Sequence, residues 1–238
     1  MSEILKECVL DSKCSYLENF KQKTHYKIIE NCTTEECDNM IERGWRRFGQ
    51  MFFRPICQEC SSCESFKIDV DNFTFTKSQR RVIKKNEDLQ LIIRQPSLTQ
   101  NHLDIFKKYH EFKQNMRGWD KQNVTPNNYY SSFVQGFEDF GHEILYFEDE
   151  KLIAVDLIDI LPNGISSIYF YHDPDSKKRS LGHYSLYRQI LLAKQKGLKW
   201  IYLGYYVEGC QSLEYKKDYK PYLTLQGRPH EEDSDVWL

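Results

Sequence analysis

The residues with the clearest chemical potential in the first part of the chain are cysteines. Seven of the eight lie within the first 63 residues, and Cys57, Cys60 and Cys63 are separated by two residues each. That spacing lets thiolates converge on zinc or an iron–sulfur cluster, although small buried thiols that simply pack are the alternative. We interpret the cysteines as reduced, because the chain is longer than small disulfide-rich secreted proteins and shows no export signal.

Arginines beside aromatic residues form a second group. The pair Arg46-Arg47 is flanked by aromatic side chains, and the pair Arg80-Arg81 lies in a basic segment. Guanidinium groups bind phosphates and carboxylates, and rings can stack on bases, so these pairs suit an RNA end or an acidic peptide end. A solvated charged face is the alternative. Because the net charge is −2, any RNA site must be a local patch.

The elements that must position these residues follow from hydrophobic spacing. The region up to residue 70 reads as cysteine-rich and loop-like, which predicts a first domain over 1–75 and a basic junction over 76–96. A domain over 97–238 follows. Within it the spacing predicts helices over 97–116 and 181–194, the second ending at Gly197, and strands over 143–147, 152–161, 165–171 and 200–203.

The order strand, loop, helix, strand resembles the core of the GNAT acyltransferases. The expected fold is therefore α+β, with a mixed, mostly antiparallel sheet, flanking helices and a Cys-rich N-terminal domain. The helix that starts at Ser180-Leu181-Gly182 offers free amides to an anion. Its sequence resembles the pyrophosphate loop of acetyl-CoA enzymes, except that Tyr184 replaces a small residue. This disfavours acetyl-CoA and leaves another anionic carrier open; an ordinary helix start capped by Ser180 is the alternative.

A wider set of motifs resembles the aminoacyl-tRNA-protein transferases, and it spans nearly the whole chain. The motifs are the run from Gly44 to Cys63, Ser78-Gln79-Arg80-Arg81, Tyr171-His172-Asp173-Pro174, Ser180-Leu181-Gly182, Leu203-Gly204-Tyr205-Tyr206, Tyr215-Lys216 and Tyr219-Lys220-Pro221. The short length, and three spaced cysteines where arginyltransferases have a Cys-Cys pair, favour the branch that transfers leucine.

The resemblance implies an enzyme that moves leucine from leucyl-tRNA to the α-amino group of proteins beginning with Asp or Glu, marking them for N-end rule degradation. It implies a cytoplasmic protein with no membrane or DNA partner and no required cofactor. An arginyl-tRNA-protein transferase, an acetyl-CoA-dependent GNAT N-acetyltransferase and a non-catalytic RNA- or metal-binding module are the alternatives.

The same resemblance suggests roles for single residues. Asp173, Tyr205 and Tyr206 are expected to border the reacting ester, although packing at a strand end is an equal alternative for the tyrosines. Cys14 joins the three spaced cysteines as a fourth possible ligand for zinc or an iron–sulfur cluster. The candidates for binding tRNA or the acidic N-terminus are Arg46, Arg47, Arg80, Arg81, Ser180, Gly182 and Lys216.

Overall fold

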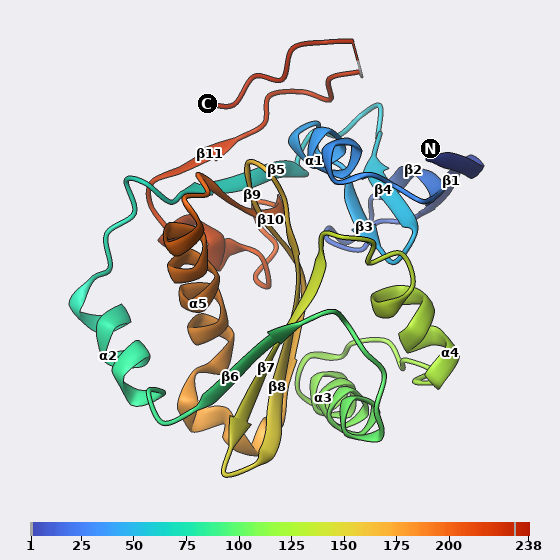
Figure 1. Cartoon of the computed structure of the whole chain (residues 1–238). Coiled ribbons are helices and arrows are strands. Elements are labelled where there is room, and N and C mark those ends of the chain that lie inside the picture. The colour runs from blue at the N-terminus through green and yellow to red at the C-terminus, as the bar shows by residue number, and fades with distance from the viewer. Residues whose placement is uncertain (1, 231) are drawn as a thin grey trace.

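The computed structural model describes residues 2–230 and 232–238 and contains two sheets (Figure 1). The smaller sheet has the antiparallel order β1-β2-β4-β3. Its strands are β1 (Glu3–Lys13), β2 (Lys21–Glu30), β3 (Arg46–Phe48) and β4 (Met51–Pro55). Helix α1 (Thr34–Glu42) packs on this sheet, and a capping box between Thr33 and Glu36 fixes its start.

The larger sheet has seven strands in the order β11-β5-β10-β9-β8-β7-β6. They are β5 (Glu64–Asp69), β6 (Gln90–Arg94), β7 (Gly141–Glu148), β8 (Lys151–Ile160), β9 (Gly164–His172), β10 (Trp200–Tyr206) and β11 (Tyr222–Thr224). Every neighbouring pair is antiparallel except β9 and β10, which are parallel. The expected mixed, mostly antiparallel sheet is therefore confirmed.

Helices cover both faces of the larger sheet (Figure 1). Helices α2 (Lys77–Lys85) and α5 (Leu181–Lys196) lie on one face, and α3 (Gln100–Arg117) and α4 (Pro126–Tyr129) on the other. The remaining turns are η1 (Tyr130–Val134), η2 (Pro174–Arg179) and η3 (Glu214–Asp218). The helices predicted over 97–116 and 181–194 are confirmed as α3 and α5, and α5 ends at Gly197 in the left-handed region. None of the described helices is long and apolar enough to cross a membrane.

The expectation that the region up to residue 70 is loop-like is wrong, because it contains β1 to β5 and α1. β1 was not predicted because ten of its eleven residues are exposed. Its sequence therefore lacks the alternation of apolar and polar residues that is typical of a half-buried strand. β5 lies in the predicted N-terminal domain, yet it hydrogen-bonds to β10 and β11 in the larger sheet. The larger sheet thus combines strands from both halves of the sequence.

β9 and β10 separate soon after they pair. Their parallel register covers only Trp200–Tyr202 against Gly164–Ser166. The register between β10 and β5 shifts between Tyr202 and Gly204, and Gly204 has a φ of +74°. The predicted order strand, loop, helix, strand is confirmed as β9, η2, α5, β10. We call the region between β9 beyond Ser166 and β10 beyond Tyr202 the strand split.

Candidate active site

Three polar side chains from distant parts of the sequence reach the strand split. They are Arg46 from β3, Gln189 from α5 and Lys216 from η3, and all three are buried. Because the ladder between β9 and β10 has ended, backbone groups here need other partners. Side chains therefore replace the missing strand-to-strand hydrogen bonds.

Lys216 satisfies the carbonyl groups of β10. Its Nζ donates to the carbonyl oxygens of Leu203, at 2.7 Å, and Tyr205. Burial lowers the pKa of Lys216 to about 7, and the nearby Arg46 guanidinium adds to this effect. The site thus holds an amine that gains and loses its proton near neutral pH.

Arg46 lies against Gly204 of β10 and also contacts β9. Its Nη1 donates to Ser166 Oγ at 3.2 Å, and its Nη2 donates to the carbonyl oxygen of Ser167. A Cβ placed on Gly204 would lie 3.1 Å from Arg46 Nε, and the positive φ also disfavours a side chain. Glycine at this position lets the guanidinium lie against the backbone of β10.

Sequence reasoning missed a carboxylate–amide pair beside this site. Gln189 Nε2 donates to both carboxylate oxygens of Asp156, at 3.0 and 2.9 Å, and to Ser167 Oγ at 3.2 Å. Burial raises the pKa of Asp156 to about 7. The available signals were a carboxylate inside an apolar strand and an amide on the buried face of α5.

Tyr205 connects β10 to the smaller sheet and to the segment that precedes β3. Its hydroxyl donates to the carbonyl oxygens of Gly44, at 2.9 Å, and Phe53, at 3.3 Å. Burial raises the pKa of Tyr205 well above its usual range, so this phenol does not supply a base near neutral pH. Tyr206 is also buried, with Lys217 Nζ 4.3 Å from its ring centroid.

Asp173 directly follows the last residue of β9, at the far end of the strand split. The residue caps η2 and accepts hydrogen bonds from Lys108, at 2.6 Å, and Lys151, at 2.8 Å. Six residues of extended chain separate it from Ser167, which corresponds to roughly 20 Å. These contacts hold the β9–η2 turn, and the expected contact of Asp173 with the ester stays a prediction.

The two arginine pairs differ in their surroundings. Arg47 is buried against Asp159, with Nε 2.8 Å from Oδ2, and also donates to the carbonyl oxygens of Gly49 and Gly136. These contacts make it a structural cation and leave it unsuited to the expected binding of tRNA or an acidic end. Arg80 and Arg81 lie exposed on α2, where a phosphate backbone can reach them.

The start of α5 differs from the expected cap. Ser180 adopts a left-handed conformation with a φ of 56° and makes no side-chain cap hydrogen bond. Gly182 is open, since a Cβ there would contact only Phe170, at 3.9 Å. Tyr184 is buried and donates to the carbonyl oxygen of Asn86. Its ring therefore does not crowd an anion at the helix start. The presence of Tyr184 in place of a small residue is thus no argument against acetyl-CoA.

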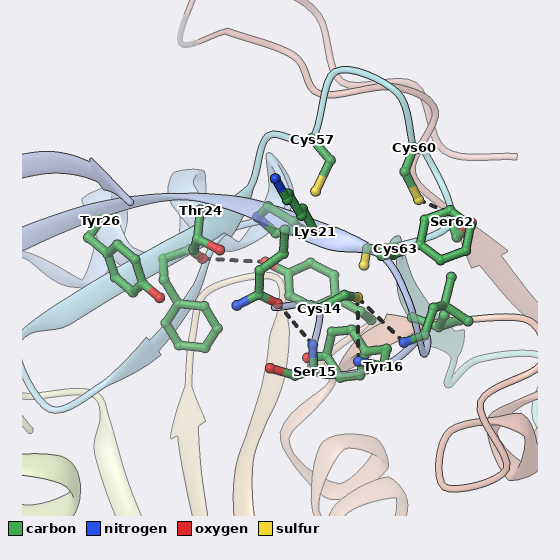
Figure 2. Close-up of a pocket in the computed structure, with 17 residues that line it drawn as sticks. Cys14, Ser15, Tyr16, Lys21, Thr24, Tyr26, Cys57, Cys60, Ser62 and Cys63 are labelled. Carbon is green, nitrogen blue, oxygen red and sulfur yellow. Dashed lines mark hydrogen bonds between the residues drawn. The ribbon is translucent and has the colours of Figure 1, made fainter. Parts of the chain in front are cut away.

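A pocket of about 160 Å³ lies beside the strand split (Figure 2). We call it the cysteine pocket; Tyr205 forms part of its wall. Its lining residues include Cys14, Cys57, Cys60, Cys63, Tyr16, Phe53 and Tyr205. All eight cysteines of the chain are free thiols. Cys14 Sγ accepts hydrogen bonds from the backbone N–H groups of Tyr16, at 3.5 Å, and Leu17, at 3.4 Å.

The four thiols of the cysteine pocket have the donor chemistry of a zinc or iron–sulfur site. Within residues 2–230 and 232–238, however, no three His, Cys, Asp or Glu side chains are grouped so that they could hold a metal ion. The residues as placed do not fit such a site.

Comparison with known proteins agrees with the motifs. The family described as "Arginine-tRNA-protein transferase, N terminus" matches residues 12–81, and its "C terminus" counterpart matches residues 101–226. A Campylobacter jejuni protein named "Aspartate/glutamate leucyltransferase" is 46% identical over 92% of each chain. A Helicobacter hepaticus protein of the same name is 36% identical, covering 94% of this chain and 93% of its own.

Among solved structures, L-PGS from Bacillus licheniformis resembles 84% of this chain and 66% of that chain, with a TM-score of 0.47 and 16% identity. The sequence relatives carry the assignment, because they cover nearly the full length at high identity. The chain belongs to the arginine-tRNA-protein transferase family.

Proposed function

We propose that the protein transfers leucine from leucyl-tRNA to the α-amino group of proteins that begin with Asp or Glu. The observation that carries this proposal is the 46% identity, over 92% of both chains, to a protein named as an aspartate/glutamate leucyltransferase. The arginyl alternative keeps a basis in the family's name, but the relatives compared above bear the leucyl name. Such an enzyme needs charged tRNA, and we propose that it works in the cytoplasm, where charged tRNA is made.

The reaction is the aminolysis of an ester. The neutral α-amino group attacks the leucyl carbonyl, a C–N bond forms, and the C–O bond to the ribose breaks. The ribose oxygen leaves with a proton, and the attacking nitrogen loses one. Because an α-amino group has a pKa of about 7.7–8.0, part of it is already neutral, and little base strength is needed.

Positioning is then the main contribution of the protein. Holding the amine and the ester in contact can supply roughly 7–11 kcal/mol. We assign this role to the strand split, where the parallel ladder ends, and to the exposed start of α5, because the first turn of a helix presents N–H groups to an anion. The exposed Arg80 and Arg81 on α2 supply positive charge for tRNA phosphates.

The test combines several donors with several acceptors. Separately labelled leucyl-, arginyl- and phenylalanyl-tRNA are each mixed with the protein and with reporters that begin with Asp, Glu or Lys. The proposal expects label on Asp and Glu reporters from leucyl-tRNA alone. Transfer only from arginyl-tRNA would establish the arginyl alternative, and acetylation from acetyl-CoA would establish a different enzyme. Binding of tRNA without transfer would indicate a non-catalytic module.

A further inference from the structure

A cavity outside the strand split lies between α3 and the connection 118–125, which leads from α3 to α4. It measures about 380 Å³ and is lined by four residues from each segment. This volume falls within the roughly 300–1,000 Å³ that is usual for small-molecule sites, whereas the 160 Å³ of the cysteine pocket does not. We call it the α3 cavity.

The α3 cavity is a fixed part of the fold. Its four residues from α3 lie three, four and seven positions apart, counted from Lys107, which places them on one face of the helix. The connection is held against α3 near its start, because the centroid of the Trp119 ring lies 5.9 Å from that of His110. Near its end, the carbonyl oxygen of Asn123 accepts a hydrogen bond from Asn128 Nδ2 at 2.9 Å. Both walls are thus positioned by contacts that need no ligand.

His110 is the most buried residue of the lining and lacks a partner on one ring nitrogen. It is 9% exposed, and its Nε2 lies 3.1 Å from the Tyr169 hydroxyl. Its Nδ1 is buried and has no hydrogen-bond partner among the described residues. Because buried polar atoms are nearly always hydrogen-bonded, an unpaired Nδ1 in a cavity wall suits a ligand that supplies the partner. Burial lowers the pKa of His110, so the ring is neutral at pH 7 and suits a neutral polar group.

The other polar groups of the α3 cavity match an adenine nucleotide. Gln114 and Asn123 bring side-chain amides from the two walls, and such amides bind N6 and N7 of adenine with two hydrogen bonds. Lys107 and Lys121 bring ammonium groups, which bind phosphate. Glu111 brings a carboxylate that accepts from an amino group. The lining therefore has partners for a neutral base and for a phosphate.

Tyr169 connects the α3 cavity with the strand split. It lies on β9 three residues after Ser166, where the parallel pairing with β10 ends. Its ring is parallel to that of His110, with 3° between the planes and 6.1 Å between the centroids. The aminoacyl ester of a charged tRNA is attached to the ribose of the terminal adenosine. The part of the tRNA that carries the ester is thus also the part that matches the cavity.

From these observations we propose that the α3 cavity binds the terminal adenosine of leucyl-tRNA and so directs its ester toward the strand split. The proposal rests on the proposed function and gives the donor a binding site. The amides of Gln114 and Asn123 bind the edge of the base that carries N6 and N7, and His110 Nδ1 gains the partner that it lacks. Hypoxanthine has nearly the same shape as adenine but carries an oxygen in place of N6, so it loses the hydrogen bonds that N6 donates.

The first experiment measures the binding of adenosine monophosphate (AMP) and inosine monophosphate (IMP) to the full chain by calorimetry, in the absence of tRNA. Gln114→Ala and Asn123→Ala each remove one amide from a wall of the cavity. Their matched controls are Asn115→Ala and Asn127→Ala, which remove exposed amides of α3 and α4 that do not line it. We expect AMP to bind at least about tenfold more tightly than IMP, and each test variant to weaken AMP binding about tenfold. The controls should leave it unchanged.

The second experiment measures the transfer of leucine to a reporter that begins with Asp. AMP should inhibit the unaltered protein in competition with leucyl-tRNA. Both test variants should raise the KM for leucyl-tRNA about tenfold and leave the KM for the reporter unchanged. Because a general folding defect lowers the amount of active protein without changing either KM, this difference between the two KM values identifies a donor site.

Several outcomes would overturn the proposal. Equal affinity for AMP and IMP, or no binding of AMP at millimolar concentration, would remove the adenine site. Unchanged AMP affinity in both test variants would place the nucleotide elsewhere, and AMP binding that does not compete with leucyl-tRNA would separate the cavity from the donor. Failure of the unaltered protein to transfer any residue refutes the proposed function itself, whereas normal transfer with an unchanged KM for leucyl-tRNA in both variants refutes only the role of the α3 cavity.

Discussion

Replacing Arg47 by Met should lower the free energy of unfolding of the protein substantially. It should leave the substrate preference unchanged. Arg47 and Asp159 form a buried, two-point ion pair between β3 and β8, and the Asp159 carboxylate is fully buried. Methionine keeps much of the volume of arginine but has no charge. The substitution therefore leaves a carboxylate with no counter-charge in the protein interior.

The magnitude follows from that burial. Removing one partner of a buried ion pair costs about 3–5 kcal/mol, which is a large part of the stability of a typical domain. The carbonyl groups of Gly49 and Gly136 also lose a donor. With a denaturant dependence of about 3 kcal/mol per molar urea, the unfolding midpoint should fall by about 1–2 M.

The assay follows urea unfolding by circular dichroism, and kcat/KM is measured below the transition. The control is the double variant Arg47→Met with Asp159→Asn, which removes the unpaired charge. We expect the double variant to recover much of the lost stability, as coupled partners in a double-mutant cycle do. Substrate preference should be unchanged in both.

The reasoning is refuted if Arg47→Met unfolds at the same urea concentration as the unaltered protein. It is refuted even more directly if the variant stays stable but raises the KM for leucyl-tRNA or for an acidic reporter. That result would return Arg47 to the binding role that its sequence context suggested.

Three further predictions concern other parts of the molecule. Hydrogen bonds from Lys108 and Lys151 outweigh the opposing effect of burial and lower the pKa of Asp173 from 3.8 to about 2. The stability that these contacts add is therefore present above pH 3.8 and lost as the pH falls toward 2. The difference in unfolding free energy between the unaltered protein and Asp173→Asn should shrink over that range, and a constant difference would contradict this role. Replacing Arg80 and Arg81 together by Gln should raise the KM for leucyl-tRNA and reduce the slope of log KM against log salt by up to about 2; an unchanged slope would show that α2 does not contact phosphates. Because no three His, Cys, Asp or Glu side chains among the described residues are grouped so that they could hold a metal ion, transfer activity should survive treatment with a chelator under reducing conditions. Loss of activity together with release of one metal equivalent per chain would show that the thiols do bind one.

The second half of the fold was predictable because its elements follow simple periodicities. Apolar residues at helical spacing and the terminal Gly197 identified α5, and β7 to β9 showed strand patterns beside turn residues. The first half was not predictable in this way. β1 is exposed along almost its whole length. Because neither of its faces is buried, its sequence lacks the alternation of apolar and polar residues that marks a half-buried strand.

The candidate site was predictable in its residue types but not in its partners. Arg46 and Lys216 stood out as cations beside aromatic residues, and the structure places both at the strand split. Arg47 looked identical to Arg46 in sequence, and only the position of Asp159 on β8 separates their roles. Gln189 and Asp156 lie 33 residues apart, and no local pattern predicts their contact.

The place of β5 within the larger sheet also has a consequence for biosynthesis. Its neighbours there are β10 and β11. During synthesis, β5 can pair with either strand only after more than 130 further residues have left the ribosome. Pairings between such distant segments make folding slow. A gene divided between its two family regions would leave β5 on the first fragment and its partners β10 and β11 on the second, so neither fragment would carry the complete larger sheet.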